Sequence, residues 1–345
     1  MTSHKKQHFI PTSYLGAWTD PECPADKDPF VWVFDADGTA SRAKAPKNIF
    51  HETDMYTITG KNGERDLRLE HGLSGLESEF ARLRRDKLAK HETLTDIEHL
   101  LVCLFIAAAH ARTPGQREHW REQWQRPLKI MDDLAERMKT ATEEQKRAMA
   151  RMPTLSSKKD RGMSHEQVRQ LVEEPLQALL FPQIRTMGPQ LAKLDFMVLE
   201  TDDDVGFITS DRPCVWCDPE GYKRPPLYRA PALMYPTIEI TFPISPRQCI
   251  VLNRMGLAGY RKSLNALLVQ HFNRRTRFWA DDQFVVCKNK TDPVWFDPGE
   301  EPEDSWEKMH ADEERRGDSA AEHLGRQERL RREWTGEDAE PQSKG

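Results

Sequence analysis

Hydrophobic and polar residues alternate along this 345-residue chain with two different periods, and each period predicts its own kind of element. Between Leu69 and Lys87, apolar residues recur at 69, 73, 76, 80 and 83, which is the spacing of one helix face. Thr95-Asp96 is a helix-start signal before a nearly all-apolar stretch that runs to His110. Because this stretch is apolar on every side, we expect it to form a central buried helix.

Short runs rich in β-branched and aromatic residues, bounded by turn signals, predict strands. Phe30 to Phe34 is such a run, and the turn Asp35-Ala-Asp-Gly38 that follows it predicts a hairpin. After residue 194 the pattern indicates two strand pairs, 196–199 with 206–209 and 237–242 with 248–252. The other predicted elements are helices over 115–150, over 164–192 with a break near Pro182, and over 265–276, and strands over 55–59 and 283–287. The predicted fold class is α+β, a mainly helical body with short antiparallel β-hairpins at the N-terminal end and after residue 194.

Composition changes once along the chain, at about residue 298. Residues 1–298 carry enough apolar segments for a single domain, whereas residues 299–345 are mostly charged, and we expect a disordered or solvated-helix tail there. The polar start lacks the apolar run of a secretory signal, and the longest apolar run, 100–109, is too short to span a bilayer. We therefore expect a cytoplasmic protein with no membrane partner.

Charge gives weak support for a nucleic-acid partner. The 51 basic and 56 acidic residues leave a net charge of −5, which provides no global attraction to nucleic acid. Two basic stretches, 82–90 and 274–277, could contact a phosphate backbone, although such runs are more often solvated helix faces. A lone Cys214-Val-Trp-Cys217 lacks the two further ligands of a structural zinc site, so we interpret it as coincidence.

Glu77 is the main anomaly of the predicted helices, because the pattern places its carboxylate beside Leu73 and Phe80 on the apolar face. Glu70 precedes it by two turns, nearly in line. A buried carboxylate is costly unless it is paired, hydrogen bonded or bound to metal. Glu77 therefore indicates either a functional site or an ion pair between helices, and the sequence leaves both open.

Three more polar residues follow the ends of predicted elements. His110 and Arg112 end the central helix, where the helix dipole favours cations, and the guanidinium of Arg112 could alternatively bind a phosphate or carboxylate. Asp211 follows a strand end at Thr209, a common place for a catalytic carboxylate and also for an ordinary turn. His8, Glu70, Glu77 and Asp211 would together make a donor set suited to Mg²⁺ or Mn²⁺.

Six groups of short segments and single residues occur in a recognisable order along the chain. They are Gln7-His8-Phe9-Ile10-Pro11 with Tyr14-Leu15, Pro46-Lys47-Asn48-Ile49 with Asp54-Met55-Tyr56, Glu70 with Glu77, Arg112-Thr113-Pro114, Thr209-Ser210-Asp211-Arg212-Pro213, and Phe242-Pro243-Ile244-Ser245-Pro246. Over about residues 5–288 this series resembles DUF4238, a family of unknown function found widely in bacteria. The resemblance implies one domain in which His8, Glu77, Arg112 and Asp211 share a site, and it implies no activity.

Two functional hypotheses follow. In the first, the chain is a metal-dependent hydrolase, such as a nuclease or phosphodiesterase, with His8, Glu77, Arg112 and Asp211 as catalytic residues: the carboxylates and His8 hold the ion that activates water, and Arg112 contacts the phosphate. In the second, the chain is a non-enzymatic interaction or structural protein, and the same groups form a buried polar network. An open pocket at these residues would favour the enzyme, and paired, sealed side chains would favour the network.

Overall fold

The computed structural model describes residues 6–60, 62–150, 162–261 and 264–299, and further towards the C-terminal end residues 302, 304–308 and 329. The chain divides into two compact units. The first comprises Met1–Cys217 and Leu233–Asp297, and the second comprises Asp218–Ala232 and Pro298–Gly345. The tail expected over 299–345 falls almost wholly outside the described residues. All elements discussed below belong to the first unit.

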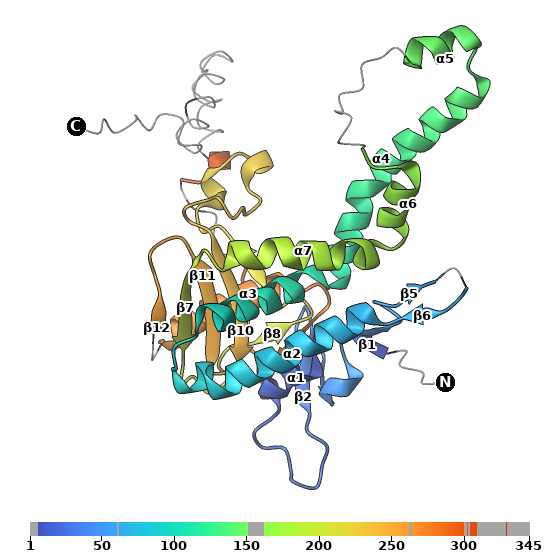
Figure 1. Ribbon diagram of the computed structural model, residues 1–345. Helices are drawn as coiled ribbons and strands as arrows, with labels where there is room; N and C mark the ends of the chain where they lie inside the picture. The colour runs from blue at the N-terminus through green and yellow to red at the C-terminus, as the bar shows by residue number, and fades with distance from the viewer. Residues whose placement is uncertain are drawn as a thin grey trace. The chain divides into compact units, whose positions relative to one another are not determined.

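Three long helices make one layer of this unit (Figure 1): α2 (Arg68–Asp86), α3 (Asp96–Ala111) and α7 (Pro175–Leu191). Helix α3 lies between the other two. Its start is fixed by a capping box, in which the Thr95 hydroxyl accepts from the Glu98 amide at 3.3 Å and the Glu98 carboxylate accepts from the Thr95 amide at 2.9 Å. The part of α3 from Val102 onward is almost wholly buried, which confirms the predicted central helix.

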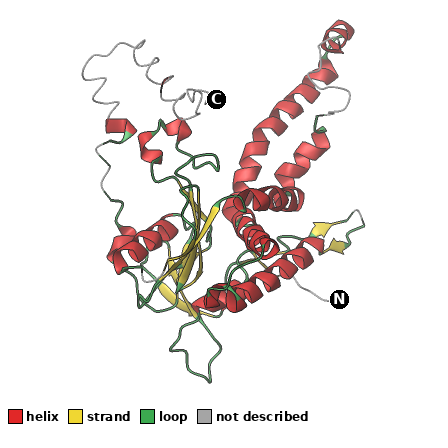
Figure 2. Cartoon of the chain, turned by 60° about the vertical axis from the view of Figure 1, so that its left-hand side comes forward, coloured by secondary structure: helices red, strands yellow, loops and turns green. Residues whose placement is uncertain are grey.

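A five-stranded sheet packs against this helical layer. Its strands, in spatial order, are β12 (Gly259–Arg261), β7 (Asp195–Glu200), β11 (Gln248–Asn253), β10 (Glu239–Ser245) and β9 (Val215–Cys217). All pairs are antiparallel except β12 with β7. Alternate residues of β11 face opposite sides: Ile250 and Leu252 join the core that holds the helices, whereas Cys249 and Val251 pack with Val269. Val269 belongs to α8 (Ala266–Phe278), so helices cover both faces of the sheet, as the turned view in Figure 2 shows.

A second sheet of four strands has the order β3 (Ser41–Lys44), β2 (Val31–Asp35), β13 (Gln283–Val286) and β8 (Thr209–Ser210). The rings of Phe34 and Phe284 stack across β2 and β13 with their centroids 5.2 Å apart, and Trp295 packs edge-on to Phe284. The remaining strands pair as β1 (Lys6–His8) with β4 (His51–Thr53) and β5 (Ile58–Thr59) with β6 (Arg65–Asp66). The remaining α-helices are α1 (Thr12–Leu15), the long α4 (Pro114–Thr140), α5 (Glu143–Ala150) and α6 (His165–Glu173).

These elements confirm the predicted α+β class and most of the predicted segments. The hairpin after Phe34 forms as β2 and β3, and the strand pair 237–252 forms as β10 and β11. No helix in the described part of the chain has the length and apolar character needed to cross a bilayer.

Two local predictions were wrong. Residues 196–209 do not form a hairpin, because β7 pairs with β11 while β8 pairs with β13 in the other sheet. The helical segment 164–192 breaks at Glu174, before Pro175, and not near Pro182. Pro175 starts α7 because proline is well tolerated in the first turn of a helix, and Pro182 is accommodated inside it.

Candidate functional site

Tyr56 lies in a polar cluster that we call the Tyr56 centre, defined as Tyr56, Glu52, Glu70, Glu77 and Arg112. Tyr56 and Arg112 are buried, whereas the three carboxylates are half-buried. Burial raises the pKa of the fully buried Tyr56 phenol; the positive charge of Arg112 opposes this, and the three carboxylates add to it. The members come from β4 and the segment after it, from α2 and from the end of α3. The cluster thus brings together several of the segments that carry the family resemblance.

The Glu77–Arg112 ion pair joins α2 to the end of α3. Nη1 of Arg112 lies 2.5 Å from Oε1 of Glu77. The Arg112 side chain is 0% exposed, whereas that of Glu77 is 24% exposed, so the pair is sealed at one end and reaches solvent at the other. Nε and Nη2 of Arg112 have no hydrogen-bond partner within the part of the chain that the structure describes. The ion pair that was one of the two alternatives for Glu77 is present, and a functional role of Glu77 stays a prediction.

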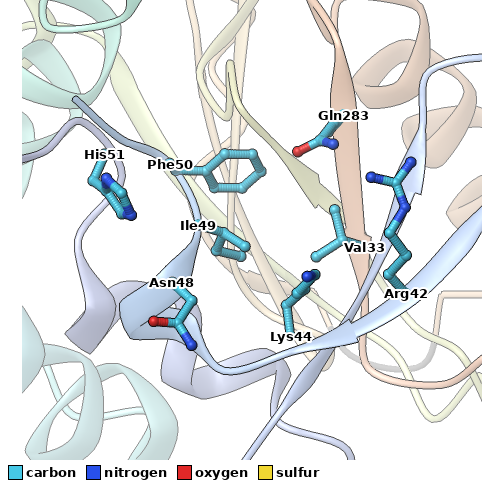
Figure 3. A pocket seen from close by; sticks show the side chains of 8 residues that line it. All are labelled: Val33, Arg42, Lys44, Asn48, Ile49, Phe50, His51 and Gln283. Carbon is cyan, nitrogen blue, oxygen red and sulfur yellow. The ribbon is translucent and has the colours of Figure 1, made fainter.

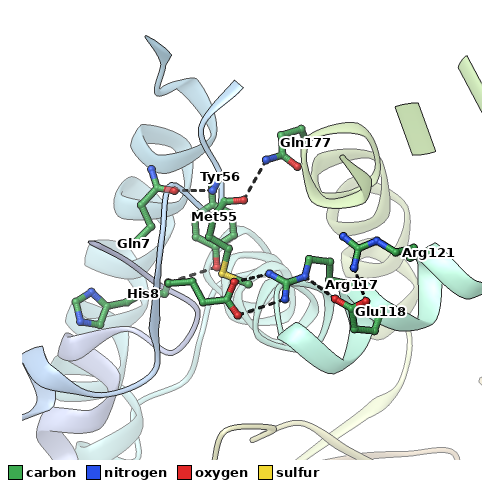
Figure 4. Close-up of polar contacts among 9 residues, drawn as sticks. Gln7, His8, Met55, Tyr56, Arg117, Glu118, Arg121 and Gln177 are labelled. Atoms are coloured by element: carbon green, nitrogen blue, oxygen red, sulfur yellow. Dashed lines mark hydrogen bonds and ion pairs between the residues drawn. The ribbon is translucent and has the colours of Figure 1, made fainter. Parts of the chain in front are cut away.

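Gln7 and His8 connect β1 to the Tyr56 centre (Figure 4). The Gln7 amide oxygen accepts from the Tyr56 backbone N–H at 2.5 Å, and its amide nitrogen donates to the Thr57 hydroxyl at 3.1 Å. The Tyr56 hydroxyl donates to the His8 carbonyl oxygen at 3.4 Å. The polar residues at the start of the chain are therefore hydrogen bonded to the segment that carries Tyr56.

Arg117 ties α4 to β4 at the edge of the Tyr56 centre. Its guanidinium forms an ion pair with Glu52, and its Nε lies 3.0 Å from Oε1 of Glu118. Figure 4 shows Arg121 approaching the same Glu118, and Nε of Arg121 also donates to the Val172 carbonyl oxygen at 3.1 Å. This chain of charges links β4, α4 and α6.

The imidazole of His8 is half-buried and touches a second histidine. Its Nε2 lies 3.3 Å from the Lys47 carbonyl oxygen, and its ring is edge-on to that of His51 with centroids 5.3 Å apart. Burial lowers the pKa of His8, the Lys47 carbonyl raises it and His51 lowers it, with Glu77 acting as a weaker raising charge. His8 is therefore neutral at pH 7 and could accept a proton.

Asp211 makes a different set of contacts. Its carboxylate accepts three backbone hydrogen bonds, from Asp281 at 2.9 Å, Asp282 at 2.7 Å and Gln283 at 2.8 Å. Burial raises the pKa of Asp211 to about 6, although these hydrogen bonds favour the charged form. The contacts anchor the start of β13, and none of the described contacts joins Asp211 to the Tyr56 centre or to His8.

The predicted metal set is not assembled in this structure. His8, Glu70, Glu77 and Asp211 all lie in the described part of the chain, and within that part no group of three or more His, Cys, Asp or Glu could hold a metal ion. Cys214 and Cys217 are free thiols, and burial raises the pKa of both. The side chains that are described therefore offer no donor set through which a metal-dependent step could be derived.

Sequence reasoning missed Arg84. Its guanidinium donates to the carbonyl oxygens of Ser13 and Tyr14, each at 3.0 Å, and of Ile244 at 3.2 Å, and burial lowers its pKa. It thereby fastens α2 to α1 and β10. A signal was present, because Arg84 follows Glu77 by seven residues and so lies on the same side of the helix.

The predicted basic stretches are largely used inside the protein. In the stretch 82–90, three cations besides Arg84 form ion pairs: Arg82 with Glu79, Arg85 with Asp86 and Lys87 with Glu92. In the stretch 274–277, Arg275 pairs with Glu239, and Arg277 donates to the Ala36 carbonyl oxygen at 2.8 Å. A role of these stretches in nucleic-acid binding stays a prediction.

A pocket of about 240 Å³ opens beside β3 (Figure 3). Its lining comes from both strands of the β2–β3 hairpin, from the segment that leads into β4 and the start of β4 itself, and from the start of β13. The lining residues are Val33, Arg42, Lys44, Asn48, Ile49, Phe50, His51 and Gln283. His51 thus lines the pocket and also contacts the ring of His8. The four residues predicted as catalytic do not line this pocket.

Comparison with known proteins gives one match. A family model described as a protein of unknown function, DUF4238, matches residues 6–291. No curated protein and no solved structure matches this chain. The match spans all the segments on which the resemblance was based, from β1 to β13, and it confirms that resemblance. The chain therefore belongs to the DUF4238 family.

Proposed function

We propose that this chain is a non-enzymatic interaction or structural protein and that its Tyr56 centre is a buried polar network. The observation that carries the proposal is the Arg112 side chain, which is 0% exposed and paired with Glu77. Substrate would have no direct access to such a guanidinium. A guanidinium that is ion-paired and closed to solvent favours a network, whereas an enzyme site opens onto a pocket.

The surrounding contacts support the same role. Gln7 holds the backbone of Tyr56, and Arg117 holds Glu52, so each polar group ties one chain segment to another. The carboxylate of Asp211 likewise accepts hydrogen bonds from three backbone N–H groups. Buried polar groups with specific partners favour one arrangement of the packed elements over others, because any other arrangement leaves a charge unpaired.

A hydrolase acting on phosphate esters, such as a nuclease or phosphodiesterase, is the second candidate. The observation that favours it is the pair of unpartnered N–H groups, Nε and Nη2, on the buried Arg112. These groups could bind a phosphate oxygen if the site opened, and neutral His8 could take a proton from the attacking water. Glu77 would orient Arg112 in this scheme, and Asp211 would act only on the fold.

Metal analysis and a hydrolysis assay separate the two candidates. Untagged protein would be assayed for bound metal and for cleavage of a model phosphodiester, with and without Mn²⁺ or Mg²⁺, beside the variants Glu77→Gln and His8→Gln. Glu79→Gln is the matched control, because Glu79 lies on the same helix in an exposed pair with Arg82. We expect neither stoichiometric metal nor turnover. Turnover that both site variants abolish and the control retains would replace the network by the hydrolase.

A further inference from the structure

The pocket beside β3 has a lining of one charge sign. Three side chains bear basic nitrogen atoms, Arg42, Lys44 and His51, and two bear amides, Asn48 and Gln283. Val33, Ile49 and Phe50 complete it, and no carboxylate contributes to the lining. An electropositive hollow with additional neutral donors is suited to an anion.

The basic groups are not equally available. Nη2 of Arg42 contacts both carboxylate oxygens of Asp35, at 2.8 and 2.6 Å, so its charge is already partly balanced. Lys44 is exposed and has no ion-pair partner within the described residues. In Figure 3 the Lys44 side chain points from the strand towards the middle of the pocket. Lys44 is therefore the group whose charge a ligand would balance.

The pocket wall is held in place by specific backbone contacts. Phe50 has a φ of 54°, an unusual conformation for an aromatic residue, and its carbonyl oxygen accepts from the Phe9 N–H at 2.9 Å. Backbone held in such a conformation is concentrated at binding sites. On the opposite side, the Gln283 backbone is fixed by Asp211 at 2.8 Å. The lining is thus formed by residues whose backbones are anchored elsewhere in the fold.

We propose that this pocket binds the phosphate group of a small phosphorylated ligand, with Lys44 facing the anion and Arg42, Asn48 and His51 supplying further hydrogen-bond donors, while the Gln283 amide is held by Asp35 at 3.4 Å. The size agrees with such a ligand. A pocket of about 240 Å³ is slightly smaller than the roughly 300–1,000 Å³ of sites for drug-sized molecules. It corresponds to the volume of about eight water molecules, which accommodates a phosphate and a small attached group. The site does not depend on whether the Tyr56 centre is catalytic.

Calorimetric titration of the full chain with inorganic phosphate tests the proposal, beside the variants Lys44→Gln and Lys47→Gln. Lys47 is the matched control, because it is an exposed lysine three residues further on that pairs with Asp28 and does not line the pocket. Both lysines are exposed, so both variants should fold. We expect one phosphate per chain and at least a tenfold loss of affinity in Lys44→Gln, with less than a twofold change in Lys47→Gln.

Parallel titrations with a nucleoside monophosphate and a sugar phosphate identify the source of the phosphate group, since the natural ligand class should bind more tightly than phosphate alone. If none of the three titrants binds at millimolar concentration, the proposal is wrong. Equal weakening in the two lysine variants would also overturn it, because that result indicates general charge attraction and not this pocket.

Discussion

Oδ2 of Asp211 accepts a hydrogen bond from the backbone N–H of Gln283 at 2.8 Å, and Gln283 lines the pocket beside β3. A residue that the sequence indicated as catalytic therefore supports the wall of a different site. Because its other two hydrogen bonds go to the preceding residues, Asp211 fixes the turn from which β13 starts.

Replacing Asp211 with Asn should unfold this turn in part. The NH₂ group of the new Asn side chain would replace a carboxylate oxygen and face a backbone N–H. A buried donor without a partner costs about 1–3 kcal/mol. We expect Asp211→Asn to lower the free energy of unfolding by about 2 kcal/mol in urea titrations. Asp281→Asn is the control, because that side chain is 36% exposed. Equal stability of both variants would show that the three hydrogen bonds do not anchor β13.

Two buried groups should make stability depend on pH in opposite directions. Burial and the positive charge of Arg212 together lower the pKa of His110 to about 4, against a backbone hydrogen bond with Cys214 that raises it. His110 therefore contributes stability above pH 6.5 that is lost as the pH falls towards 4. The raised pKa of Asp211, about 6, contributes stability below pH 4 that is lost as the pH rises through 6.

Each of these contributions amounts to about 3 kcal/mol at most, so the two nearly cancel in the wild type. Thermal melts between pH 4 and 7 should reveal the two contributions as differences between each variant and the wild type, because the lowered pKa values of His8, His99 and His271 add to the pH dependence of all three proteins. His110→Asn should become relatively more stable towards pH 4, and Asp211→Asn relatively less stable. Parallel profiles for all three proteins would contradict the assigned pKa directions.

Arg84 should contribute more to stability than its neighbour in the same charged stretch. Arg84→Met leaves three carbonyl oxygens without their donor, and we expect a loss of about 2–3 kcal/mol in the free energy of unfolding. Arg85→Met is the matched control, since the Arg85 side chain is 71% exposed and pairs only with the adjacent Asp86. Its replacement should change stability by less than about 0.5 kcal/mol. Similar losses in the two variants would show that Arg84 does not fasten α2.

The helices could be predicted because their signals are local. The apolar spacing on α2 and the capping box at Thr95 each lie within a few residues of the helix that they specify. The strand segments were recognised for the same reason, but the pairing of β8 was not. Val285, the partner of Thr209, lies 76 residues further along the chain, and nothing in residues 196–209 specifies it.

The candidate site was predicted only in part, for a similar reason. The helical pattern placed Glu77 on an apolar face, yet its partner Arg112 lies on another helix, and only the packing of α2 against α3 brings them together. The pocket had no sequence signal at all. Lys44 and Arg42 are ordinary exposed residues of a short edge strand, and Gln283 joins them from β13, far along the chain.

The most direct test of the central claim is the free energy of unfolding of Glu77→Gln, measured in urea beside Glu79→Gln. A structural network predicts that Glu77→Gln loses about 3 kcal/mol, because the buried Arg112 charge is left without its partner, while the exposed control changes by less than about 0.5 kcal/mol. Catalytic groups are held at a cost to stability, so their replacement is neutral or stabilising. An unchanged or increased stability of Glu77→Gln would contradict the network and favour a catalytic site.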